Sequence, residues 1–131
     1  MRKAVLLGLA SMLAAASAAA DPVTERKEIL KGLGDDTKPA VAMMKGEAPY
    51  DQARVDALLA AYVSAAARLP ALFPPGSDVG KTDALPRVWA EKPKFDSLFE
   101  KFGVDAKAAQ GKIADAAGLK SSCSKKSRII A

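Results

Sequence analysis

Apolar residues recur every three or four positions along three stretches of the chain, and this spacing is typical of helices that bury one face. The stretches cover about residues 24–45, 52–69 and 93–113. The middle stretch is the most regular, with apolar positions at Val55, Leu58, Leu59, Tyr62, Val63, Ala66 and Leu69. No stretch alternates between polar and apolar residues as a half-buried strand would. The pattern therefore predicts an all-α protein, an antiparallel bundle of the four-helix type with only three clear helices.

The ends of the first two predicted helices carry residues that start or stop a helix. Asp21 or Thr24 can cap the first helix and Asp51 the second, because such side chains accept hydrogen bonds from the first N–H groups of a helix. Residues 46–50 are expected to form the turn between the two helices. Pro39 lies inside the first helix and is expected to bend it.

A long connection, residues 70–86, precedes the third helix and is rich in proline and glycine. Long ordered loops are usually functional or wrapped on the core. The apolar side chains expected to anchor this connection on the bundle are Phe73, Leu85, Val88 and Trp89.

The last thirteen residues, 119–131, lack the apolar spacing of the upstream helices. Their only large apolar side chains are Leu119, Ile129 and Ile130. The others include one cysteine and four basic residues: Lys120, Cys123, Lys125, Lys126 and Arg128. We expect a bundle domain over residues 21–118, followed by a solvated, irregular basic tail where the bundle needs its fourth helix.

The first twenty residues have the three parts of a secretory signal peptide. Arg2 and Lys3 precede an apolar run over residues 4–13, and alanines at 18–20 suit cleavage before Asp21. The apolar run is shorter than the roughly 20 residues that span a bilayer. The mature chain is therefore expected to start at Asp21, to lie in the periplasm and not to insert into the membrane.

Composition narrows the possible chemistry. The 131 residues include no histidine and one cysteine, which excludes histidine acid–base catalysis, the usual zinc sites and a disulfide within the chain. Cys123 has basic neighbours but no evident base beside it, so we expect neither an enzyme nor a metal site built from side chains alone. The net charge of +5 comes from the two ends, because residues 21–118 hold 14 basic and 15 acidic side chains. A nucleic-acid partner is therefore not expected.

Four segments, in order along the chain, resemble the class II c-type cytochromes, the group of cytochrome c′ and its six-coordinate relatives. The segments are Glu25–Lys31 (ERKEILK), Met44–Asp51 (MKGEAPYD), Leu69–Pro74 (LPALFP) and Ala84–Trp89 (ALPRVW), the last followed by Phe95. The resemblance implies a four-helix bundle that carries electrons or binds gases in the periplasm. It also implies haem c, held by Cys-x-x-Cys-His on the last helix, with a redox partner protein and pairing of two copies through the first two helices.

The resemblance assigns haem-site roles to individual positions. Arg26 falls on the family's first-helix arginine near the haem edge, and Lys27 follows it. Leu30 falls where relatives place a methionine ligand or an apolar side chain, and Leu30 itself cannot ligate iron. Asp83 falls on a polar position that faces the haem in some members. The simpler interpretations are that Leu30 belongs to the core and that Arg26 and Asp83 lie on the solvated surface.

The tail departs from the family's pattern. Placing Arg128 on the arginine that follows the haem motif puts Cys123 on the second cysteine, Lys120 on the first and Ser124 on the histidine. One thiol can form one thioether, but serine does not replace imidazole as an iron ligand. Haem c is therefore expected to be absent, or present without an axial ligand.

Two functions follow from these observations. One is a periplasmic haem-binding electron-transfer protein by resemblance, unable to ligate haem with this sequence. The other is a non-haem helical protein of the cell envelope that acts by binding another protein. The family pattern stops near Ala117, so we further expect the tail to come from a shifted reading frame. One of many synonymous back-translations of residues 118–131, read two nucleotides later, gives apolar residues at helical spacing and then a cysteine.

Overall fold

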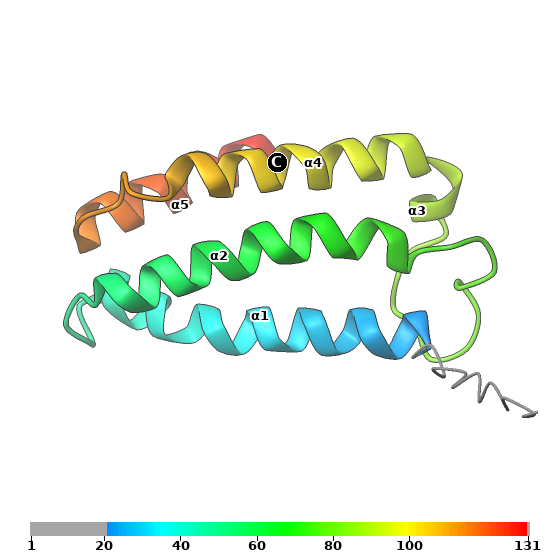
Figure 1. Ribbon diagram of the computed structural model, residues 1–131, viewed down its shortest axis with the longest axis horizontal. Helices are drawn as coiled ribbons and strands as arrows, with labels where there is room; N and C mark the ends of the chain where they lie inside the picture. The colour runs from blue at the N-terminus through cyan, green and yellow to red at the C-terminus, as the bar shows by residue number, and fades with distance from the viewer. Residues whose placement is uncertain (1–20, 131) are drawn as a thin grey trace, which may run out of the picture.

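Six helical elements, separated by turns and one long loop, make up the part of the chain that the structure describes (Figure 1). The structure is a computed structural model and describes the backbone of residues 21–130 and the side chains of residues 21–123. The elements are α1 (Pro22–Lys45), α2 (Gln52–Arg68), the 3-10 helix η1 (Leu69–Leu72), α3 (Arg87–Ala90), α4 (Lys92–Ala109) and α5 (Ala116–Ile130). Between residues 21 and 130 there is no strand, so the predicted all-α class is confirmed. The predicted signal peptide lies outside the described residues.

Local signals set the ends of α1 and α2 as the sequence predicts. Asp21 caps α1, because its carboxylate accepts hydrogen bonds from the backbone N–H and the hydroxyl of Thr24, each at 3.0 Å. These bonds hold the pKa of the Asp21 carboxyl below its usual value. Gly46 ends α1 in the left-handed conformation, with φ of 75°. Asp51 caps α2 by accepting the N–H of Arg54 at 3.1 Å.

The second helix is the centre of the bundle. It lies between α1 and α4 and runs antiparallel to both (Figure 1). Its length and composition together with η1 would suffice to cross a membrane, yet its most apolar face packs inside the protein. The buried residues of α2 are Val55, Leu58, Leu59, Ala65 and Ala66, and Leu69 of η1 continues their face. Most of the apolar positions predicted for this stretch are thus confirmed as core.

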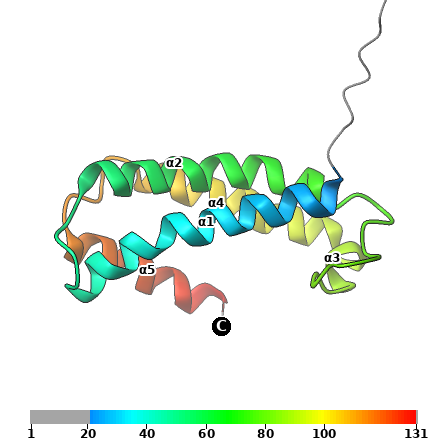
Figure 2. The ribbon, with the colours of Figure 1, turned by 90° about the horizontal axis from the view of Figure 1, so that it is seen from below.

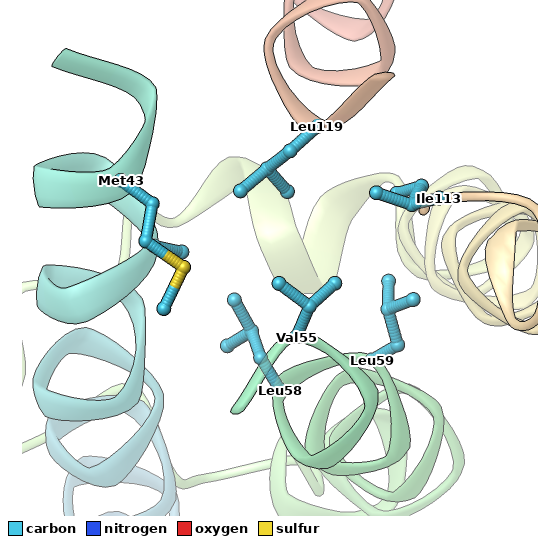
Figure 3. Packing of buried hydrophobic residues seen from close by; sticks show 7 residues of the cluster. Met43, Val55, Leu58, Leu59, Ile113 and Leu119 are labelled. Atoms are coloured by element: carbon cyan, nitrogen blue, oxygen red, sulfur yellow. The ribbon is translucent and has the colours of Figure 1, made fainter. Parts of the chain in front are cut away.

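The C-terminal segment is a helix, so the prediction of an irregular tail is wrong, although Lys120, Ser121 and Cys123 are solvent-exposed as expected. Asp115 caps α5 by accepting the N–H of Gly118 at 2.6 Å, and Leu119 is only 4% exposed. Figure 3 shows Leu119 pointing from α5 towards the core side chains of α1 and α2. This helix is stabilised at its start by one N-cap and one buried leucine. A search for apolar residues at regular spacing does not detect such a helix. The expected boundary at residue 118 therefore falls inside α5.

The third predicted helix is shorter than expected. It ends at Ala109 instead of residue 113, and Gly111 turns the chain with φ of 72°. Ile113 is nevertheless buried, because the turn folds it back onto α2. Leu98, one of the large apolar residues of this stretch, is 60% exposed because it lies on the outer side of α4.

The fifth helix covers only part of the bundle. It has 15 residues against 24 in α1, and its contacts are with α1. Figure 2 shows α5 beginning beside the C-terminal end of α1 and leaving the N-terminal half of α1 uncovered on that side. The bundle therefore has one incomplete side.

Candidate functional site at the Arg26 end of the bundle

Arg26 is a buried guanidinium near the start of α1. Its side chain is folded against the loop between η1 and α3, and the residue is 2% exposed. Nη1 donates to the carbonyl of Leu72 at 3.0 Å and to Ser77 Oγ at 3.1 Å. Nη2 donates to the carbonyl of Ser77 at 2.9 Å and to Thr82 Oγ1 at 2.6 Å. One side chain of α1 thus fastens three separate points of the loop.

Aromatic rings surround the same guanidinium. The Arg26 Cζ atom lies 4.5 Å from the ring centroid of Phe73 and 5.6 Å from that of Trp89, which is within the range of a cation–π contact. Trp89 donates its indole N–H to the carbonyl of Pro74 at 2.9 Å, and Phe73 packs on Phe95 with centroids 4.8 Å apart. The expected anchoring by Phe73 and Trp89 is confirmed, whereas Leu85 is 68% exposed and anchors nothing.

Arg26 forms no salt bridge with a carboxylate among the described residues, although its charge helps to lower the pKa of the Asp21 carboxyl. Each of its hydrogen-bond acceptors is a carbonyl or a hydroxyl oxygen. The neighbouring Glu25 pairs instead with Arg68, at 2.8 Å. A buried cation is tolerated only when its donors are satisfied. Here the neutral acceptors and the ring faces supply that compensation.

The other α1 and loop positions singled out from the sequence lie around Arg26. Lys27 is exposed and donates to the carbonyl of Lys81, so it also holds the loop. Leu30 lies one turn after Arg26 and is 49% exposed. Asp83 is exposed in the loop. Of the simpler interpretations, a core Leu30 and a solvated Arg26 are wrong, because the short α5 leaves Leu30 uncovered and the loop closes over Arg26.

Cys123 does not belong to this group. It lies on α5, is exposed, and lines a cavity at the other half of the bundle together with Met44. The structure therefore brings Arg26 and Lys27 to the loop that carries Asp83, but it leaves Cys123 apart from them. Ser77 and Thr82 could not be predicted from the sequence. Loop residues that accept hydrogen bonds from an arginine follow no periodic pattern and carry no sequence signal of their own.

The residues present do not fit a c-type haem. Covalent attachment through Cys-x-x-Cys-His needs two thiols and an imidazole, and the chain has one cysteine and no histidine. Among the described residues, no group of three or more histidine, cysteine, aspartate or glutamate side chains is placed to hold a metal ion. Both terminal nitrogens of Arg26 already donate to protein oxygens. The Arg26 end is thus a loop clamp in this chain.

Comparison with known proteins gives a consistent family. A family model described as cytochrome c′ matches residues 21–127. The match continues past Ala117, so the expectation that the family pattern stops there is wrong. The curated cytochrome c′ of Rhodopseudomonas palustris is 52% identical over 106 residues, covering 80% of this chain and 73% of the relative. A cytochrome c-556 of the same organism is 35% identical, covering 92% and 85%.

Solved structures agree with these sequence matches. The structure of cytochrome c′ from Rhodopseudomonas palustris has a TM-score of 0.76 at 50% identity, covering 80% of this chain and 85% of the other. Cytochrome c prime from Shewanella frigidimarina has a TM-score of 0.70 at 26% identity, covering 83% and 87%. The similarity therefore extends over the bundle and not over a single motif.

Proposed function

The chain belongs to the cytochrome c′ family, and on that premise we propose that it descends from a periplasmic haem-binding electron-transfer protein and that, with this sequence, it does not ligate a covalent haem. The family assignment supports the first part, since the relatives are cytochromes. The second part rests on one observation, the absence of histidine from a chain with a single cysteine.

The chemistry of attachment explains why this observation decides the matter. A c-type haem is bound through two thioether bonds, and the histidine that follows the second cysteine ligates the iron. Cys123 supplies one sulfur at most, and Ser124 follows it in the chain. A hydroxyl is a poor ligand for haem iron compared with imidazole. Without bound haem the chain has no redox centre. We therefore expect it to interact with a redox partner only in a form to which haem binding has been restored.

Arg26 and Lys27 keep a role in this proposal that does not depend on haem. Their hydrogen bonds hold the loop over residues 72–82 against α1. A family position near the haem edge thus acts here as a structural support. We expect the chain to fold in the periplasm as a helical protein that is not an enzyme. The alternative to haem-based electron transfer is then a function in binding another protein.

The test is expression of the full chain together with a haem-attachment system, followed by intact mass and visible absorption of the purified protein. We expect no haem adduct and no Soret band. The matched control is the double variant K120C/S124H, which completes Cys-x-x-Cys-His around Cys123 with two substitutions. This variant is expected to gain one covalent haem and a Soret band.

The control makes each result decisive. Haem in K120C/S124H but not in the parent chain shows that the two missing residues are the cause. A haem adduct with a low-spin spectrum in the parent chain contradicts the proposal. The variant C123S, which removes the remaining sulfur, then shows whether that adduct used Cys123.

A further inference from the structure

A cavity of about 350 Å³ lies between α1, α2, α4 and α5, away from the Arg26 end of the bundle. The residues of α1 that line it start at Thr37, about three turns after Arg26, and none of the residues that bind the Arg26 guanidinium takes part. Most of its lining is aliphatic, including Ala40, Val55, Leu58, Leu59, Ala109 and Ile113. The cavity is large enough for a small organic molecule, since known ligand pockets start near 300 Å³.

The incomplete fourth side explains why this space exists. Leu119 is buried among the core residues of α1 and α2, but Ser122 and Cys123, one turn later on α5, are the next side chains to reach the cavity. Two small polar side chains fill less volume than the branched apolar residues of a usual bundle core.

The hydroxyl groups of the lining restrict the polarity of an occupant. Thr37 Oγ1 lies 2.6 Å from the carbonyl of Leu33 and 2.7 Å from Tyr62 Oη. A hydroxyl carries one hydrogen, so Thr37 donates to the carbonyl and Tyr62 donates to Thr37. Tyr62 therefore has lone pairs left to accept a hydrogen bond but no hydrogen left to donate.

The charges of the lining restrict the occupant further. Asp105 is the one charged side chain among the described residues that line the cavity. Its carboxylate oxygens lie 3.0 and 3.2 Å from Lys101 Nζ, one turn earlier on α4. The cavity offers no cation to an anionic ligand, and the carboxylate already has its counter-ion. A charged occupant would lose its hydration without compensation.

From the volume, the aliphatic lining and the acceptor that Tyr62 Oη offers, we infer that this cavity binds a small neutral apolar molecule with one hydrogen-bond donor, of the phenol or aromatic-amine class. The apolar body fills the space between the four helices, and the donor meets Tyr62 Oη. This site does not involve haem, and three of its lining residues, Leu119, Ser122 and Cys123, belong to the segment after residue 118.

The test uses the neutral dye N-phenyl-1-naphthylamine, whose fluorescence rises in apolar surroundings and which carries one N–H donor. We expect saturable binding to the full mature chain, with a midpoint independent of protein concentration. Ala109→Leu, which fills the cavity, is expected to weaken binding at least tenfold. The matched control Ala60→Leu places the same side chain on the exposed side of α2 and should leave binding unchanged.

Competition and labelling give tests that do not depend on the folding of a variant. 1-Naphthol should displace the dye at least tenfold better than naphthalene-1-sulfonate, because the sulfonate brings an uncompensated charge. Reaction of Cys123 with N-cyclohexylmaleimide should block the dye in the parent chain, while C123S, treated in the same way, should still bind it.

Three results would overturn the inference: no saturable binding to the parent chain, equal binding by A109L and the parent, or unchanged binding after labelling of Cys123. A midpoint that moves with protein concentration would place the dye between two copies of the chain, which also contradicts a site inside the monomer.

Discussion

At the scale of single residues, Arg26 shows how a charged side chain becomes part of a core. Its hydrogen-bond acceptors are all neutral, and residues 72–82 contribute all four of them. Hydrogen bonds from a charged donor contribute more than those between neutral groups, about 1.5–3 kcal/mol each. Burial of the charge without an anion offsets much of this gain. The net effect is that the loop is held in one place by one residue.

Replacing Arg26 by alanine is therefore expected to lower the free energy of unfolding by about 2–3 kcal/mol, because four acceptors lose their donor. Urea titration measures this loss. Trp89 is the chain's single tryptophan, and it packs within 5.6 Å of the Arg26 guanidinium, so its fluorescence should shift to the red as the loop loosens.

Lys27→Ala is the matched control for this change, since Lys27 is exposed and donates to the same loop. We expect it to change stability by less than about 0.5 kcal/mol, as is usual for surface positions. If Arg26→Ala lowered the free energy of unfolding by as little as Lys27→Ala, the hydrogen bonds from Arg26 to the loop would not contribute to stability.

At the scale of elements, the helices begin where a side chain satisfies their first N–H groups. Asp21, Asp51 and Asp115 each do this for a different helix, at α1, α2 and α5. The cap at α5 is the most informative of the three, because Leu119 is the only buried side chain among the described residues that follow it. A short helix can thus form from a cap and one anchor where periodicity predicts none.

The cap of α2 offers a clean measurement, because α2 is the central helix of the bundle. Asp51→Ala is expected to lower the free energy of unfolding by about 1 kcal/mol, the usual cost of losing an N-cap. Asp51→Asn keeps an acceptor oxygen and gives up only the exposed ion pair with Arg54, so it should stay within a few tenths of a kcal/mol of the parent. Equal losses in both variants, measured by thermal or urea unfolding, would mean that charge and not capping is responsible.

At the scale of the whole molecule, the bundle has three long helices and a fourth that is too short to cover the others. The uncovered side includes Leu30, which is 49% exposed. The incomplete side favours our proposal that the residues after about 118 come from a shifted reading frame, whereas the family match continues through this segment to residue 127. In that proposal another frame encodes a longer apolar helix for this side.

Sequencing the gene through and beyond codon 131 tests the proposal directly. We expect a neighbouring frame to encode apolar residues at helical spacing and then Cys-x-x-Cys-His. A chain with that frame restored is expected to carry covalent haem, seen as a mass adduct and a Soret band, and to cover Leu30. If no frame contains the motif, the proposal is wrong and α5 is the native fourth helix of this protein.

The sequence by itself determined the elements that depend on neighbours along the chain. The extents of α1 and α2 follow from apolar spacing, from the caps Asp21 and Asp51 and from Gly46, and the structure has α2 over 52–68 where 52–69 was predicted. These signals act within one or two turns, so they can be read without the fold. The family was equally accessible, because its motifs are continuous segments.

Only the tertiary structure decided what each side chain meets. Arg26 is buried and Leu30 is exposed, the reverse of what their chemical types suggest, because a loop more than 40 residues away closes over one and α5 stops short of the other. The helix at residues 116–130 forms because Leu119 finds the core residues of α1 and α2. Burial depends on which elements come to lie beside a residue, and that arrangement is a property of the packed bundle instead of any local stretch.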